Sequence, residues 1–143
     1  MEPVVVVAVA VVIATAVAMV VRRRRPQPPT QPGYSAPAQV DRADFDQPGA
    51  PWLLAVFTSS TCDSCAAARD KAAVLASADV GVQEIEVSAR KDLHDRYRID
   101  AVPTIVLADA DGVVKATFIG PPSATDLWAA VAEAREGRNA GEN

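Results

Sequence analysis

The sequence predicts an α/β domain behind one N-terminal transmembrane helix. Three observations lead to this prediction. Residues 4–21 form a long apolar run, and residues 39–136 alternate between strand-like and helix-like segments. The only two cysteines of the 143-residue chain, Cys62 and Cys65, are two residues apart and lie where a strand-like run meets a helical segment. A chain of this length suffices for one domain with accessory segments.

The apolar run over residues 4–21 has 18 residues and only Thr15 is polar. As a helix rising ~1.5 Å per residue it spans roughly 27 Å, which is close to the hydrocarbon thickness of a bilayer. The alternative is a cleaved signal peptide, which needs a positive region before the apolar run and a small-residue cleavage site after it. Only Met1, Glu2 and Pro3 precede the run here, and arginines follow it. We therefore expect a retained membrane anchor.

Residues 22–38 form a basic cluster and a Pro-rich linker. Arg22 to Arg25 directly follow the anchor, so the positive-inside rule predicts a single-pass cell-membrane protein with its domain on the cytoplasmic side. An extracytoplasmic domain is the alternative. Prolines at 26, 28, 29, 32 and 37 favour an extended polyproline conformation that could hold the domain up to roughly 40 Å from the membrane.

The charge is unevenly spread along the chain. Residues 1–38 hold four arginines and one acid, whereas residues 39–143 hold 10 Lys and Arg against 17 Asp and Glu. The acidic domain lacks the basic face that nucleic-acid binding requires. Two cysteines are too few for a disulfide-rich secreted scaffold, but they are enough for one redox pair.

The first half of the domain, from residue 39, reads as strand, helix, strand. Residues 39–45 predict a short strand or turn, and the apolar run 52–57 predicts a strand that is buried on both faces. Residues 66–78 predict a helix with Ala67, Val74 and Leu75 on its apolar side. Alternation of Val82, Ile85 and Val87 with acidic residues predicts a strand over residues 80–87.

The second half predicts a helix, a hairpin and a last helix. Residues 92–98 form a short helix, a proline opens the strand 103–107, and residues 113–119 pair back after a turn at 109–112. Gly112 is free to take a positive φ in that turn. Ser123 and Asp126 form a capping box, and Leu127, Trp128 and Val131 lie on the apolar side of the helix that follows. Residues 137–143 are expected to form a flexible tail.

The cysteine pair carries the chemistry. A strand that runs into Cys-x-x-Cys at a helix N-terminus is typical of redox-active dithiols. The helix dipole favours the thiolate of Cys62, which is the nucleophile in disulfide exchange. Cys65 is then placed to resolve the mixed disulfide from within the same chain.

These elements and two motifs together resemble the thioredoxin family over residues 39–136. The motifs are residues 62–65, Cys-Asp-Ser-Cys, and residues 101–104, Ala-Val-Pro-Thr. The resemblance implies a central mixed sheet flanked by helices and a membrane-anchored bacterial thioredoxin-domain protein. It also implies a cis Val102–Pro103 bond in a loop that faces the cysteines, so that Val102, Pro103 and Thr104 bind the substrate backbone.

The chain departs from classical thioredoxins at three places. Thr61 stands where the family usually has Trp, and Asp63 and Ser64 replace the usual Gly-Pro between the cysteines. We assign a redox-tuning role to Asp63 and Ser64, because a negative charge beside the Cys62 thiolate raises its pKa and opposes the helix dipole. The family carboxylate that assists proton transfer at the second cysteine is replaced by Val56.

Other interpretations of the same residues are weaker. A closed zinc site needs four ligands, and the chain offers only Cys62, Cys65 and His94, so we expect no metal. His94 lies in a polar helical stretch, which predicts a solvated side chain. Trp52 and Trp128 fit packing roles better than substrate platforms.

The sequence thus predicts a membrane-anchored thiol–disulfide oxidoreductase that needs no cofactor. Its expected partners are a protein disulfide substrate, possibly one associated with the membrane, and a protein that donates or accepts electrons. The alternative is a membrane-tethered redox sensor or adaptor in which the Cys pair reports oxidation without turnover.

Overall fold

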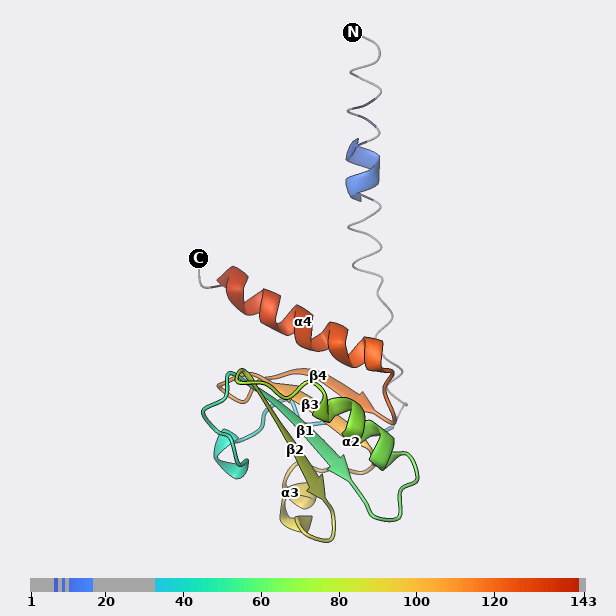
Figure 1. The fold of residues 1–143 in the computed structure, drawn as a ribbon, viewed down its shortest axis with the longest axis vertical. Helices are drawn as coiled ribbons and strands as arrows, with labels where there is room; N and C mark the ends of the chain where they lie inside the picture. Colours follow the sequence, from blue (N-terminus) through green and yellow to red (C-terminus); the bar gives the residue numbers. More distant parts are fainter. Residues whose placement is uncertain (1–6, 8, 10, 17–32, 142–143) are drawn as a thin grey trace.

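The structure is a computed structural model that describes residues 7, 9, 11–16 and 33–141. Within these ranges the chain forms four strands and a set of helices around one sheet (Figure 1). In chain order the elements are η1 (Arg42–Asp44), β1 (Trp52–Thr58), α2 (Cys65–Ala73), β2 (Val80–Glu86), α3 (Lys91–Arg96), β3 (Thr104–Ala108), β4 (Val114–Ile119) and α4 (Ala124–Gly141).

The sheet is mixed and has the order β2-β1-β3-β4. β1 pairs in parallel with β2 and antiparallel with β3, and β3 pairs antiparallel with β4. The register aligns Thr58 with Glu86, Phe57 with Thr104, and Thr104 with Ile119. The ends of β1, β2 and β4 and the start of β3 therefore meet at one end of the sheet, which is where the cysteine-bearing loop leaves β1.

The central strand β1 is buried along its whole length, as its apolar run predicts. Its side chains alternate between two cores, as the twofold repeat of a strand requires. Trp52, Leu54 and Val56 pack under α2 and α4, whereas Leu53, Ala55 and Phe57 pack against α3 and the segment around η1. The sheet thus lies between two layers, and α2 and α4 cover the same face (Figure 1).

Helix α2 is shorter than predicted and buries a different side. It ends at Ala73 instead of continuing to residue 78, and its buried residues are Cys65, Ala68 and Ala72. Ala67 and Val74 are exposed, so their assignment to the apolar face is wrong. Because alanine is abundant on every side of this helix, hydrophobicity alone does not mark the face that meets the sheet.

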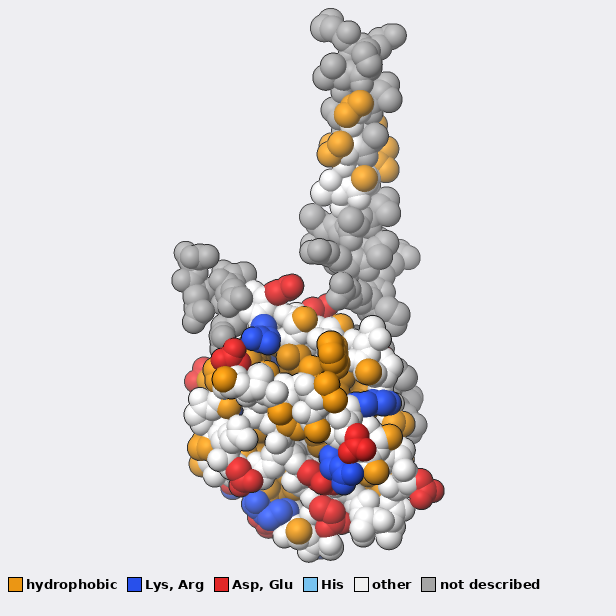
Figure 2. Space-filling view, viewed as in Figure 1, with side chains coloured by type: hydrophobic (Ala, Val, Ile, Leu, Met, Phe, Trp, Pro, Cys, Tyr) orange, Lys and Arg blue, Asp and Glu red, His pale blue; other side chains and the backbone are white. Residues whose placement is uncertain are grey.

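Trp128 does not lie on the buried side of α4, contrary to the sequence prediction. Leu127 and Val131 are buried, whereas Trp128 is 53% exposed. Successive helical residues point about 100° apart, so Trp128 turns away from the stripe that residues 127 and 131 form. Figure 2 shows hydrophobic side chains at the surface on the face that carries α2 and α4.

His94 is buried and is not the solvated side chain that the sequence predicts. It is 5% exposed, its Nε2 lies 2.9 Å from the carbonyl oxygen of Ile85, and its ring meets the Phe57 ring edge-on. Leu93 and His94 both face the sheet, because α3 is a short helix that presses its first turn onto β1 and β2. The acidic residues beside His94 in sequence gave no sign of this packing.

The local turn and cap signals are confirmed. Gly112 has a φ of +79° in the β3–β4 turn, and the Ser123 hydroxyl accepts the Asp126 backbone N–H at 3.1 Å at the start of α4. Residues 39–45, where we expected a short strand or a turn, form one bridge between Gln39 and Val113, followed by η1. Helix α4 continues to Gly141, into the stretch where we expected a tail.

The expected anchor at residues 4–21 lies largely outside the described residues, as do residues 22–32 of the basic cluster and linker. Residues 11–16 are helical and exposed, and the Thr15 hydroxyl donates to the Val11 carbonyl at 2.7 Å. Among the parts of the chain that the structure describes, no helix is both long enough and apolar enough to cross a bilayer.

Candidate redox site

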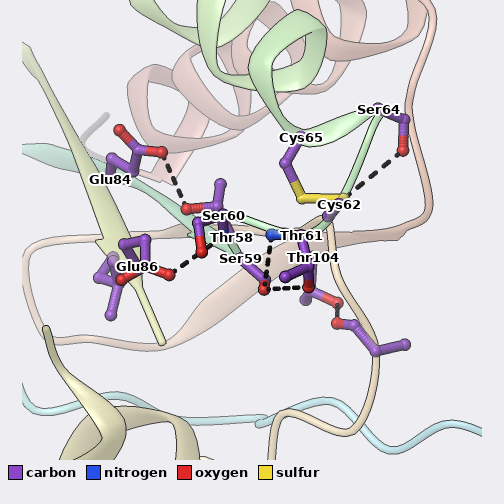
Figure 3. The surroundings of a disulfide bond; sticks show 12 residues. Thr58, Ser59, Ser60, Thr61, Cys62, Ser64, Cys65, Glu84, Glu86 and Thr104 are labelled. Atoms are coloured by element: carbon purple, nitrogen blue, oxygen red, sulfur yellow. Dashed lines mark hydrogen bonds between the residues drawn. A yellow bond between two sulfur atoms is a disulfide. The ribbon is translucent and has the colours of Figure 1, made fainter. Parts of the chain in front are cut away.

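Cys62 and Cys65 form a disulfide at the N-terminus of α2 (Figure 3). Their Cα atoms are 5.5 Å apart, within the usual range for this bond. The Cys65 N–H donates to the Cys62 carbonyl at 3.3 Å, and the Ala68 N–H donates to the Ser64 carbonyl at 3.1 Å. These bonds start the helix at Cys65, so Cys62 lies in the loop just before the positive end of the helix dipole.

The two sulfur atoms differ in exposure. Cys62 is half-buried, whereas Cys65 is 3% exposed and packs within the buried side of α2. A disulfide or thiol of another molecule can therefore approach Cys62 and not Cys65. This asymmetry fits the order of attack predicted from the sequence, with Cys62 first.

The two residues between the cysteines differ in their environments. The Ser64 Oγ lies 3.8 Å from the Cys62 Sγ, and only the hydroxyl can donate in this contact, because the disulfide sulfur carries no hydrogen. Asp63 is exposed, and within the described ranges its carboxylate makes no hydrogen bond or ion pair. Ser64 can therefore stabilise a Cys62 thiolate with a hydrogen bond, whereas Asp63 adds an uncompensated negative charge beside it.

Glu86, at the end of β2, fastens the loop that precedes Cys62. Its carboxylate accepts the N–H groups of Ser60 at 3.1 Å, Ser88 at 2.8 Å and Ala89 at 3.1 Å, and it also accepts the Ser88 hydroxyl. The Ser88 hydroxyl bond and these N–H groups hold the pKa of Glu86 below its usual range, against the opposing effect of desolvation. Sequence reasoning missed Glu86, because its contact with residue 60 depends on the pairing of β1 and β2.

A second acidic residue of β2, Glu84, lies in register with Val56. Its carboxylate accepts the Thr58 hydroxyl at 2.8 Å and lies 3.7 Å from the guanidinium of Arg69 on α2. Val56 itself is fully buried under α2. The β1 residue beneath α2 is therefore apolar, and the carboxylate of Glu84 lies on the neighbouring strand β2.

The second predicted motif forms the loop before β3, and the Val102–Pro103 bond is cis, as expected. Val102 is half-buried, and Pro103 and Thr104 are buried. The Thr104 hydroxyl donates to the Ala101 carbonyl at 2.8 Å, which closes the loop on itself. Pairing of Thr104 with Phe57 brings this loop to the same end of the sheet as the cysteines, and Figure 3 shows Thr104 in the surroundings of the disulfide.

Gly120 follows β4 and completes this end of the sheet. Its N–H donates to the Pro103 carbonyl at 2.8 Å, and its φ is +92°. The loop after β4 is thereby tied to the cis-proline loop. Within the described part of the chain, no group of three or more His, Cys, Asp or Glu side chains is arranged to hold a metal ion.

A mixed sheet with the order β2-β1-β3-β4, a Cys-x-x-Cys pair at the start of a helix and a cis-proline loop beside it define the thioredoxin class of fold. The chain belongs to the family of thioredoxin-like domains, which matches residues 38–135. No curated protein matches the chain.

Solved thioredoxins share this fold. A mutant thioredoxin from Halobacterium salinarum NRC-1 is 26% identical with a TM-score of 0.52, over 66% of this chain and 89% of that one. The oxidised form of mitochondrial thioredoxin 3 from Saccharomyces cerevisiae is 24% identical with a TM-score of 0.52, over 59% of this chain and 80% of that one. The family and the Cys62–Cys65 disulfide together point to thiol–disulfide redox chemistry.

Proposed function

We propose that this chain is a membrane-anchored thiol–disulfide oxidoreductase that acts on protein disulfides. The observation that carries the proposal is the asymmetric cysteine pair, with an approachable Cys62 and a buried Cys65 at the start of α2. The cis-proline loop at the same end of the sheet offers a place for the substrate chain, through Val102, Pro103 and Thr104.

The reaction follows from this geometry. The Cys62 thiolate attacks one sulfur of a substrate disulfide, the substrate S–S bond breaks, and one substrate thiolate leaves and takes up a proton. The Cys65 thiol then loses its proton and attacks the Cys62 sulfur, which releases the second substrate thiol. The substrate has gained two electrons, and the protein is left with the Cys62–Cys65 disulfide.

The direction of electron flow depends on the compartment. Arg22 to Arg25 after the apolar run 4–21 support a single-pass protein with a cytoplasmic domain, where thiols are kept reduced and reduction of substrates is the natural direction. A thiol donor must then reduce the disulfide again after each turnover. Residues 22–38 would act as a spacer that keeps the domain near substrates at the membrane. Protease protection of the domain in sealed vesicles tests the orientation.

The experiment that tests exchange is a trap in the full-length chain. The Cys65→Ser variant attacks through Cys62 but lacks the thiol that resolves the mixed disulfide. After acid quenching we expect defined adducts on Cys62 that dissolve in reductant, whereas Cys62→Ser gives none. If Cys62 in the trap variant stays free and can still be alkylated, with no adducts, the proposal is wrong.

The second candidate is a non-catalytic redox sensor or adaptor on the membrane. The observation in its favour is the fully buried Val56, which leaves no carboxylate on β1 beneath α2 to assist proton transfer at Cys65. Repeated reduction of a protein disulfide by the full-length chain, with an excess of dithiol as donor, supports the enzyme. Oxidation of the pair without turnover supports the sensor.

A further inference from the structure

Asp63 is the feature of the site that the proposed chemistry does not use. It lies between the two cysteines in an exposed loop, and none of the described residues neutralises its carboxylate. Deprotonation of Cys62 adds a second negative charge next to it. An exposed anionic side chain with no partner among the described residues therefore stands next to the reactive cysteine in the chain.

Of the cations near this end of the sheet, Arg69 and Arg90 pair with acidic residues, whereas no ion pair is formed by Lys71 or Arg98 among the described residues. Arg69 pairs with Asp70 and Glu84, and the Lys71 ammonium donates to the Pro122 carbonyl at 3.0 Å. Arg90 pairs with Asp92, and Arg98 lines a cavity beside Ser35 and Tyr97. None of these four side chains makes an ion pair or a hydrogen bond with Asp63.

Two further acids lie in segments that adjoin this end of the sheet, one before the cis-proline loop and one in the first turn of α4. Asp100 is exposed in the segment that leads to the cis-proline loop, and its carboxylate accepts only the Ser35 hydroxyl, at 2.9 Å. Asp126 is exposed at the start of α4, where its carboxylate accepts the Ser123 hydroxyl at 2.7 Å. Neither carboxylate meets a cationic side chain, and Asp63 remains the charged residue next to Cys62 in the chain.

We propose that Asp63 makes the exchange selective for disulfides flanked by basic residues. This inference rests on the proposed function, since it names the class of substrate that the same site takes. In the mixed disulfide the Cα atoms of the two bonded cysteines lie about 5–6 Å apart, so residues next to the substrate cysteine come close to Asp63. A Lys or Arg there is attracted and a Glu or Asp is repelled.

The test compares two peptides that differ only in the charge beside one intramolecular disulfide, with Lys in one and Glu in the other. The reduced full-length chain in neutral detergent reacts with each in a single turnover. Each rate is divided by the rate of the same peptide with a neutral small dithiol, which removes the intrinsic reactivity of the peptide. We expect a Lys-to-Glu preference of about 3- to 10-fold at low ionic strength, from one near-surface charge pair. The preference falls toward one at about 1 M salt, where the Debye length is ~3 Å.

Three variants make the test specific to Asp63. Asp63→Asn abolishes most of the preference, and Asp63→Lys reverses it. Any change in the thiolate fraction of Cys62 affects both peptides equally and cancels in the ratio. Asp111→Asn removes a carboxylate from the turn at the opposite end of the sheet and leaves the preference intact.

The outcomes separate the two proposals. If neither peptide is reduced by the chain, the proposed function itself fails. If both are reduced and the ratio is near one, or is the same in Asp63→Asn as in the unaltered chain, exchange stands and the selectivity inference is overturned.

Discussion

The Ser64 hydroxyl oxygen lies 3.8 Å from the Cys62 sulfur, and among the described residues it is the one hydrogen-bonding side chain that this sulfur meets. In the reduced protein the same hydroxyl can donate to the Cys62 thiolate. A hydrogen bond to the charged form lowers the pKa of an acid. We therefore expect Ser64 to act with the helix dipole, and against Asp63, on the pKa of Cys62.

The first prediction concerns the loss of the Ser64 hydroxyl. Ser64→Ala raises the pKa of Cys62 by about half a unit to one unit, because one unit corresponds to ~1.4 kcal/mol and a sulfur acceptor is weaker than oxygen. The pKa of Cys62 is measured in a reduced Cys65→Ser background, from the thiolate absorbance as a function of pH. Ser77→Ala, in an exposed turn, is the control. An equal pKa in both variants would refute a role for Ser64.

Glu86 gives the second prediction. The folded-state pKa of Glu86 is lowered, mainly by the Ser88 hydroxyl bond. A lowered pKa means that its contribution to stability is present above the unfolded value of about 4.3 and is lost as pH falls through the folded value. Glu86→Gln therefore lowers the free energy of unfolding at neutral pH, and the difference from the unaltered chain shrinks below about pH 4.

Urea unfolding at a series of pH values checks the role of Glu86. Glu136→Gln, on an exposed part of α4, is the matched control and leaves the pH profile unchanged. Glu86→Gln also loosens the loop before Cys62, so that exchange slows for every substrate. A constant difference between Glu86→Gln and the unaltered chain across this pH range would contradict the linkage.

Tyr97 gives the third prediction. Its hydroxyl donates to the Asp44 carboxylate and accepts the Asp41 N–H at 2.9 Å. Burial, helped by the bond to Asp44, raises the pKa of Tyr97 to about 12. Since folding favours the neutral phenol, its contribution to stability is full below the unfolded value of about 10 and is lost as pH rises toward 12.

The alkaline behaviour of two tyrosine variants tests this linkage. Tyr97→Phe destabilises the fold by about 1–2 kcal/mol at neutral pH, because it leaves partners of the hydroxyl unpaired. Tyr97→Phe also abolishes the loss of stability that ionisation of Tyr97 causes between about pH 10 and 12. Tyr34→Phe, at an exposed position, changes neither the stability at neutral pH nor the loss of stability at alkaline pH. Phenolate absorbance of the folded chain provides an independent reading, in which one tyrosine titrates late.

The parts of the fold that were predicted correctly are those that local sequence determines. The apolar run of β1, the positive φ of Gly112 and the Ser123 cap each depend on a few adjacent residues. His94 and Trp128 were misread, because their burial depends on which side of a helix meets the sheet. Short or alanine-rich helices carry too little pattern to decide that.

The candidate site divides in the same way. Cys62, Cys65 and Pro103 could be singled out, because the chemistry and the backbone conformation belong to the residues themselves. Glu84, Glu86 and Gly120 could not be, since their contacts with Thr58, Ser60 and Pro103 join segments far apart in the chain. They follow only from the strand register, which a single sequence does not reveal.

The last prediction concerns the turn that holds the N-terminal segment to the sheet. Gly112 has a φ of +79°, its carbonyl accepts the Val40 N–H at 2.8 Å, and an added Cβ would lie 1.9 Å from the Val40 carbonyl oxygen. Gly112→Ala must therefore both strain the backbone and push the segment around Val40 away. We expect a loss of about 1–3 kcal/mol in the free energy of unfolding by urea.

Gly137→Ala is the control for Gly112→Ala. Gly137 lies within α4, and an added Cβ would have nothing within 4 Å. Alanine is the better helix former by about 0.8–1 kcal/mol, so this variant stabilises the chain, or is neutral if the end of α4 frays. Opposite signs for the same substitution would show that the cost at Gly112 comes from the turn and its contact with Val40. Equal effects at both positions would refute that contact as the cause.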